Sequence, residues 1–395
     1  MTVGADPVPV EDPAFFASDC DGALAGLRRE CPVAWQESVG SWVVTGHEAI
    51  VEISRDPDRF CSRLGVLPND RGRLVAASDS ILYLDPPVHS TYRKLVSRAF
   101  TPRRVNGLEP RIRALAVGLL DAVDPGSPVD AVDALTAPLP LDVIAELLGV
   151  PRGDRGDFRI WSDAVMAAAT ELTDEVAALA FELFLYFDRH LDARTAEPAD
   201  DLLTALVTAE VEGQQLTRQE QLGFCMTLLV AGNETTRSLL SGGLVALAEH
   251  PEQRAALAAD PSLIPAAVEE MLRWVTPIMA MSRTATGDTT VGAQPVAGDD
   301  YLVMVYGAGN RDEAVFGESA DRFDISRSPN PHLAFGFGEH FCIGASLARL
   351  EARVFFSELL ARWPMYEIVG EPVRTPSTLL RAVTSLPVRF EPSTR

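Results

Sequence analysis

Residues 332–349 read HLAFGFGEHFCIGASLAR, and this stretch decides how the chain is interpreted. Its one cysteine, Cys342, is surrounded by glycines, and a helical pattern follows immediately. We therefore expect Cys342 in a glycine-bent loop before a helix N-terminus, where backbone N–H groups and the helix dipole can stabilise a thiolate. The alternative, a buried cysteine in a turn, requires neither the glycine spacing nor the flanking aromatic residues. These neighbours are Gly336, Gly338, Gly344, Phe335 and Phe341.

The composition limits the classes of function. The 395 residues include five cysteines without a CxxC pair, which argues against a disulfide framework and a zinc site. The formal net charge of −22 argues against nonspecific nucleic-acid binding, and Lys94 is the only lysine among the basic residues. No signal peptide is recognised, and no apolar run approaches the ~20 residues of a membrane-spanning helix. We therefore expect a cytoplasmic protein. Four cysteines are interpreted as core residues: Cys20, Cys31, Cys61 and Cys225.

Most of the chain has the hydrophobic periodicity of helices. The longest expected helix begins with a capping box at Thr217 and Glu220 and runs to His250, roughly 50 Å. We expect one mainly α domain over residues 1–395, with a minor β portion. Further helices are expected over 108–122, 141–148, 163–194, 263–274 and 345–362, and strands over 41–45 and 302–306.

The centre of the longest helix has an unusual composition. Residues 231–236 read AGNETT, in which a glycine costs about 1 kcal/mol relative to alanine. Packing against another helix is one explanation. The other is that a large flat group approaches the backbone and that polar groups face it.

With these motifs the chain resembles the cytochrome P450 family over nearly its whole length. The loop pattern F-x-x-G-x-[HR]-x-C-x-G is met by residues 335–344. The resemblance implies the family's fold and a haem b (iron protoporphyrin IX) whose iron is bound by Cys342, since a thiolate ligand favours O–O cleavage. It also implies further cofactor contacts from the same loop, by Phe335, Gly336, His340 and Gly344.

The central helix matches the family motif A-G-x-[DE]-T-[TS]. The resemblance assigns Thr235 to hydrogen-bond dioxygen and Glu234 to relay protons, and it places Ala231 and Gly232 against the cofactor. A threonine hydroxyl can both donate and accept a hydrogen bond, so a carboxyl group connected to solvent can reload it.

Four cationic or imidazole side chains match family positions that bind the haem propionates. His89 and Arg93 lie in a D-P-P-x-H-x-x-x-R segment, Arg283 follows in a probable strand, and His340 is in the cysteine loop. Bidentate pairing with carboxylates favours arginine at such sites. In isolation, each could instead form a surface ion pair.

Two further sets follow from the resemblance. Glu270 and Arg273 match the family's E-x-x-R helix and, with Arg322, are expected to form an ion network that holds the cysteine loop. The substrate pocket is expected to include residues that could also be ordinary core, methionine being an adaptable wall. These are Thr227, Val230, Ile278, Met279 and Met281, with the loop 62–80.

We find no flavin or iron–sulfur motif, so the resemblance implies a separate ferredoxin-type electron donor. It would dock on a basic face. The implied reaction is oxygen-dependent hydroxylation of an apolar small molecule of steroid, terpenoid, fatty-acid or polyketide type. A peroxide-driven peroxygenase and a non-catalytic haem-thiolate sensor are the alternatives; the Glu234–Thr235 pair favours the monooxygenase. The residues expected to dock the electron donor are Arg93, Lys94, Arg98, Arg103, Arg104, Arg349 and Arg353.

Overall fold

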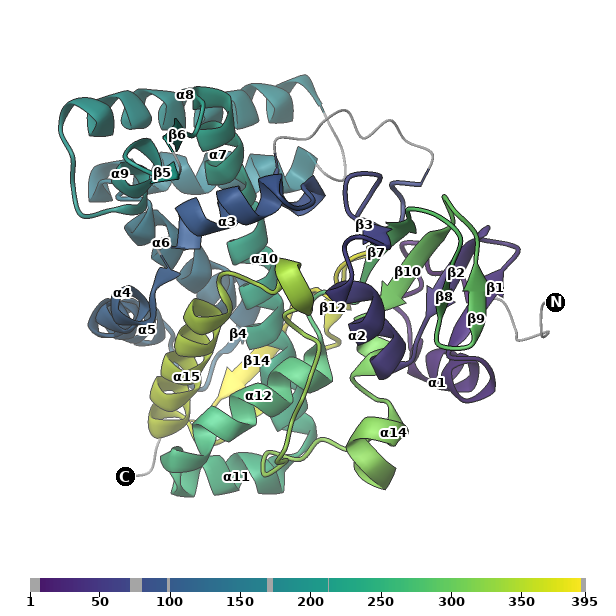
Figure 1. Ribbon diagram of the computed structural model, residues 1–395. Helices are drawn as coiled ribbons and strands as arrows, with labels where there is room; N and C mark the ends of the chain where they lie inside the picture. The colour runs from purple at the N-terminus through teal and green to yellow at the C-terminus, as the bar shows by residue number, and fades with distance from the viewer. Residues whose placement is uncertain (1–7, 72–79, 98–99, 169–172, 212, 392–395) are drawn as a thin grey trace.

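The computed structural model describes residues 8–71, 80–97, 100–168, 173–211 and 213–391. It is mainly helical with a minor β portion, which confirms the predicted fold class (Figure 1). No helix within these ranges is long and apolar enough to span a membrane. The cytoplasmic location and the single domain over residues 1–395 stay predictions.

Helix α10 (Arg218–Glu249) crosses the middle of the molecule (Figure 1). The predicted capping box is present, because the Thr217 side chain accepts from the backbone N–H of Glu220 and the Glu220 carboxylate accepts from that of Thr217. Glycines bring neighbouring helices close to α10. A Cβ added to Gly243 would lie 2.6 Å from the Phe356 ring, so alanine would push the two helices apart.

Four other predicted helices are confirmed within a few residues. They are α5 (Glu109–Asp121), α6 (Pro138–Leu147), α12 (Ile264–Val275) and α15 (Ala345–Arg362). Besides α7 (Arg155–Ala168) and α8 (Asp174–Ala196), the other α-helices of the described residues are α1 (Asp21–Glu30), α2 (His47–Arg55), α3 (Val88–Ser97), α4 (Pro102–Gly107), α9 (Leu202–Val207), α11 (Pro251–Ala259), α13 (Tyr306–Gly309) and α14 (Glu313–Phe316).

The single helix predicted over 163–194 is wrong. The chain forms α7 (Arg155–Ala168) and α8 (Asp174–Ala196), which pack against each other. Thr173 starts α8 by accepting a hydrogen bond from the backbone N–H of Val176. Apolar periodicity continues on both sides of this start, so periodicity alone did not reveal it.

A five-stranded sheet lies beside the helical part, in the order β1-β2-β10-β7-β3. The predicted strands correspond to β2 (Ser41–Val44) and β10 (Tyr301–Val305), which pair in parallel. All of β10 is buried because alternate residues enter two different core clusters. The other strands of this sheet are β1 (Val33–Gln36), β7 (Ala280–Ala285) and β3 (Phe60–Cys61).

Several short strands form small separate sheets. Each has only two to four residues, too few to show a period in the sequence. They are β4 (Pro128–Asp130), β11 (Tyr366–Ile368) and β14 (Pro387–Phe390); β5 (Glu210–Val211) and β6 (Gln214–Gln215); β8 (Thr289–Val291) and β9 (Gln294–Val296); β12 (Val373–Arg374) and β13 (Val383–Ser385).

Candidate functional site

The cysteine loop lies directly before α15, as predicted. The backbone N–H of Cys342 donates to the carbonyl oxygen of Phe335, 2.9 Å away, which closes the loop. Gly336 and Gly338 have φ angles of +67° and +69°, which favour glycine. A Cβ added to Gly338 would lie 2.0 Å from the carbonyl oxygen of Ser54. The loop therefore packs tightly against α2.

The surroundings of Cys342 have opposing effects on the pKa of its thiol. Burial raises the pKa of this thiol, while backbone hydrogen bonds from Gly344 and Ala345 and the charges of Arg93 and Arg349 lower it. The lowering groups are those that stabilise a thiolate at a helix N-terminus. Cys342 as a whole residue is nevertheless exposed, which leaves space for a ligand beside the loop.

The four side chains predicted to bind propionates come together beside this loop. The rings of His89 and His340 have centroids 4.2 Å apart. Burial lowers the pKa of His340 to about 2, and the charges of Arg283, His89 and Arg93 act in the same direction. Arg93 also donates to the carbonyl oxygen of Phe341. Residues far apart in the sequence thus form one positively charged cluster.

This cluster fits an anionic ligand. His89 is buried, and its Nδ1 has no hydrogen-bond partner among the described residues, although a carboxylate oxygen of Glu339 lies 4.0 Å away. Ser62 Oγ lies 3.1 Å from His340 Nε2. A buried polar atom without a partner costs free energy, which a ligand carboxylate would recover. The two propionates of a haem next to Cys342 fit this donor set.

The middle of α10 has an open face. Val230 is 44% exposed and Ala231 is exposed, whereas most apolar residues of this helix are buried. The Thr235 hydroxyl lies on the same face and donates to the Ala231 carbonyl oxygen at 2.7 Å. Gly232 points elsewhere, since an added Cβ would lie 2.7 Å from Ile144 on α6. Helix packing explains Gly232, and its contact with a cofactor stays a prediction.

Glu234 forms an ion pair that the sequence analysis did not include. Its partner is Arg237, one turn later on α10. Burial raises the pKa of the Glu234 carboxyl, the charge of Arg237 lowers it, and that of Asp163 raises it. The carboxyl group is thus largely buried but tied to a cation. Spacing of i, i+3 was the available signal.

The E-x-x-R pair is fully buried, and Arg273 binds both carboxylate oxygens of Glu270, at 2.8 and 2.7 Å. The prediction for Arg322 requires a correction. Its backbone carbonyl accepts from Arg273, but the second guanidinium on Glu270 is that of Arg327, at 3.1 Å. Arg322 is exposed, whereas the side chain of Arg327 is only 6% exposed.

A second network holds the helix after the cysteine loop. Arg349 binds both oxygens of Glu269, at 2.7 and 2.8 Å, and its guanidinium lies over the Phe335 ring. His332 Nε2 is 3.1 Å from the same carboxylate. Burial raises the pKa of Glu269, but these partners outweigh it and lower the pKa to about 2. Arg349, predicted to dock a donor, is therefore engaged within the protein.

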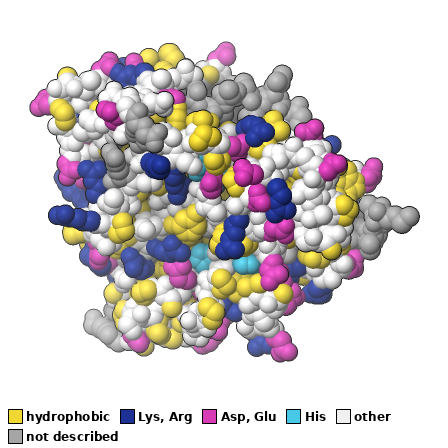
Figure 2. All heavy atoms as spheres, in the orientation of Figure 1, with side chains coloured by type: hydrophobic (Ala, Val, Ile, Leu, Met, Phe, Trp, Pro, Cys, Tyr) yellow, Lys and Arg dark blue, Asp and Glu magenta, His cyan; other side chains and the backbone are white. Residues whose placement is uncertain are grey.

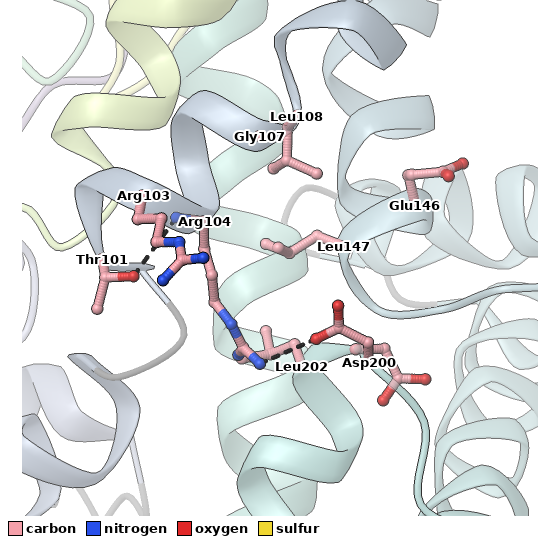
Figure 3. Close-up of a pocket in the computed structure, with 10 residues that line it drawn as sticks. Thr101, Arg103, Arg104, Gly107, Leu108, Glu146, Leu147, Asp200 and Leu202 are labelled. Atoms are coloured by element: carbon pink, nitrogen blue, oxygen red, sulfur yellow. Dashed lines mark hydrogen bonds and ion pairs between the residues drawn. The ribbon is translucent and has the colours of Figure 1, made fainter.

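Basic side chains gather over α4, α5 and α15 on the face shown in Figure 2. Arg103 on α4 and Lys94 on α3 are both exposed, while Arg104 pairs with Asp200 at 3.0 Å. Both α4 arginines border a cavity of about 580 Å³ between α4, α6 and α9 (Figure 3). None of the residues lining this cavity belongs to the cysteine loop. Arg98 lies outside the described residues.

The predicted substrate residues are only partly placed together. Met279 is fully buried and abuts Gly307, which favours a core position, and its place in a substrate pocket stays a prediction. Ile278 and Met281 are half-buried, and Thr227 donates to the carbonyl oxygen of Gly223. The loop 62–80 is described only at 62–71 and at residue 80.

Two leucines that the sequence analysis missed lie beside Ile278. Met279 donates its backbone N–H to the carbonyl oxygen of Leu379 at 2.8 Å, and Ile278 forms a β-bridge with Leu380. Both leucines come from an irregular stretch about 100 residues later, which offers no periodic signal.

Comparison with known proteins gives consistent similarities. The family model "Cytochrome P450" matches residues 157–261 and 259–390. A methyl-branched lipid omega-hydroxylase of Mycobacterium tuberculosis is 37% identical over 95% of this chain and 93% of the relative. Cytochrome P450 CYP109Q5 from Chondromyces apiculatus is similar in structure, with TM-score 0.88, 39% identity and 98% coverage of both chains. CYP109E1 from Bacillus megaterium in complex with testosterone has TM-score 0.85 and 34% identity, over 94% of this chain and 99% of that one.

Proposed function

This chain belongs to the cytochrome P450 family and is a monooxygenase, and from that premise we propose that Cys342 is the thiolate ligand of a haem b. The family implies a haem-thiolate cofactor. The observation that carries the assignment is the cationic cluster beside Cys342, with its unpartnered Nδ1 on His89. When bound, a haem with a thiolate ligand supplies the centre that activates dioxygen, because the sulfur favours O–O cleavage.

His89, Arg93, Arg283 and His340 would hold the propionates. The arginines supply permanent charge, and the imidazoles supply N–H donors, since burial lowers the pKa values of both His89 and His340. A neutral imidazole still donates one hydrogen bond. The cluster would therefore orient the cofactor edge without depending on protonated histidine.

Glu234 and Thr235 would deliver protons to the open face of α10. The raised pKa of Glu234 allows its carboxyl to hold a proton closer to neutral pH than an exposed glutamate does. The Thr235 hydroxyl, now bonded to the Ala231 carbonyl, can turn to donate outward and be reloaded. Arg237 keeps the Glu234 side chain oriented on α10.

The substrate would be an apolar small molecule of steroid, terpenoid, fatty-acid or polyketide type. The names of the relatives support this class, since one is a methyl-branched lipid omega-hydroxylase and another was solved with testosterone. Val230 is exposed and Ile278 and Met281 are half-buried, so these side chains would supply apolar surface to the substrate.

One comparison separates this function from its alternatives. Purified protein should show the carbon-monoxide difference band of a haem thiolate, and Cys342→Ser should lose it. Product from testosterone or dodecanoic acid should require dioxygen and a ferredoxin system. Product with peroxide alone would instead indicate a peroxygenase. Ligand binding without product in either system would indicate a sensor. Absence of the difference band would refute the haem-thiolate assignment.

Electrons would come from a ferredoxin-type donor that docks on the basic face. The predicted residues Arg93 and Arg349 already bind groups within the protein, so exposed Lys94 and Arg103 are the sharper test, with Arg98 and Arg104 as further candidates. The double variant Lys94→Gln, Arg103→Gln should slow reduction by the donor about tenfold and leave reduction by dithionite unchanged. Arg29→Gln, at an exposed position of α1, is the control. Unchanged donor kinetics in the double variant would exclude this docking face.

A further inference from the structure

The N-terminal helix α1 contacts the turn between β12 and β13, which carries the two leucines beside Ile278. Asp21, in the first turn of α1, binds the guanidinium of Arg381 at 3.1 and 3.3 Å. Arg311 reaches the same carboxylate at 3.2 Å. The two cations lower the pKa of Asp21 against the opposing effect of burial.

Arg381 also holds the C-terminal end of the turn between β12 and β13 in place. Its backbone N–H donates to the carbonyl oxygen of Pro277 at 3.1 Å, next to Ile278. Two backbone hydrogen bonds thus join the turn to residues 277–281. The Arg381 amide donates to Pro277, and the Leu379 carbonyl oxygen accepts from Met279. The side chain of Arg381 therefore binds Asp21, while its backbone N–H binds Pro277, in the segment proposed to border the substrate.

The N-terminal segment makes a second contact with the same turn. The backbone N–H of Ser377 donates to the carbonyl oxygen of Pro13 at 2.7 Å. The Ser377 hydroxyl oxygen accepts from the backbone N–H groups of Leu379 and Leu380, at 3.1 and 3.0 Å. Residues before and at the start of α1 therefore hold both sides of the turn that carries the leucines.

Helix α1 itself is firmly anchored. Arg28 donates to the carbonyl oxygen of Ala308 at 3.1 Å and pairs with Glu313 at 2.9 Å. In addition, the guanidinium of Arg311 lies over the ring of Trp274, 3.9 Å from its centroid. Trp274 belongs to α12. Because α1 is anchored, Asp21 can hold Arg381, and with it the turn between β12 and β13, in one position.

We propose that Asp21 is a positioning residue for substrate recognition, because through Arg381 it sets how closely Leu379 and Leu380 lie against Ile278. The inference rests on the proposed function, in which the 277–281 segment borders the substrate. It assigns a role in ligand shape selection to a helix that lies beneath the sheet, away from the cysteine loop (Figure 1).

The experiment compares two ligands that bind haem iron through a nitrogen atom but differ in bulk. Imidazole reports on the haem alone, whereas clotrimazole also needs room at the pocket wall. In Asp21→Asn and in Arg381→Gln, the Kd of clotrimazole should rise on the order of fivefold, with that of imidazole unchanged. Arg381→Gln leaves the Asp21–Arg311 pair in place, so it remains informative if Asp21→Asn folds poorly. Glu313→Gln, which removes an anchor of the same helix outside the turn, should change neither Kd.

Amide hydrogen exchange supplies a readout that needs no ligand. Exchange at residues 375–382 should be faster in Asp21→Asn and Arg381→Gln than in the wild type and in Glu313→Gln. Unchanged exchange there, or equal changes in the affinities of both azoles, would overturn the proposal. Failure of the wild type to bind imidazole would refute the proposed haem site instead, and the exchange data would still decide the role of Asp21.

Discussion

Arg237 and Glu234 form an ion pair between successive turns of α10, with side chains that are 19% and 13% exposed. Burial alone would favour the neutral carboxyl, and the cation partly reverses this preference. The group thus combines a raised pKa with a fixed orientation, two properties that suit a residue reloading the Thr235 hydroxyl.

Glu234→Gln should reduce product formation with dioxygen and a ferredoxin system by about 10²-fold, since the amide cannot transfer the proton. The carbon-monoxide difference band should remain. Glu249→Gln, at the exposed end of the same helix, is the matched control. An equal loss in the dioxygen and peroxide assays would show that Glu234 acts on something other than proton delivery.

Arg327→Gln should lower the free energy of unfolding by about 2 kcal/mol, because it removes a hydrogen-bonded cation from the buried carboxylate of Glu270. Arg322→Gln should change it by less than about 0.5 kcal/mol, since the variant keeps the backbone carbonyl that Arg273 uses. Urea unfolding of both variants checks the assignment. Greater destabilisation by Arg322→Gln would reverse it.

The Glu269 network should make stability depend on pH. In the folded protein the pKa of Glu269 is lowered from its ordinary 4.5 to about 2. Ionised Glu269 therefore stabilises the fold above pH 4.5, and this contribution is lost as the pH falls towards 2. The wild type should be more stable than Glu269→Gln at about pH 7, and the difference should shrink by about pH 3.5. Glu367→Gln, at an exposed ion pair, should show no such trend in urea unfolding.

Gly338→Ala should fold with little bound haem, because the added Cβ would collide with Ser54 and the φ of +69° disfavours alanine. Gly26→Ala, in helix α1 with no atom near the new Cβ, should be neutral or stabilising by up to about 1 kcal/mol. The ratio of haem to protein measures the effect. Full haem content in Gly338→Ala would contradict the tight packing of the loop on α2.

Local patterns in the sequence predicted the cysteine loop, the capping box of α10 and the strand β10, though not that β10 is buried. In each case the signal lies within one short stretch, such as glycine spacing around Cys342 or Thr217 followed by Glu220. The cationic cluster was predicted as well, although only through the family resemblance. Its members lie far apart in the chain, and spacing alone does not bring His89 near Arg283.

Choices between equivalent neighbours could not be predicted. Arg322 and Arg327 are five residues apart in one irregular stretch, and only the path of the chain around Glu270 selects Arg327. Met279 directly precedes β7, and its burial follows from tertiary packing against Gly307, which has no local signature. The contact of Leu379 with Met279 joins segments about 100 residues apart and has no local signature.

Lys94 has a practical consequence for studies of electron transfer. It is the only lysine of the chain, it is exposed on α3, and it follows Arg93 directly. Apart from the terminal amine, an amine-reactive cross-linker or dye will therefore attach at one known point on the basic face. The protein can be labelled there without mutagenesis, and a cross-linked donor can be mapped to a single peptide.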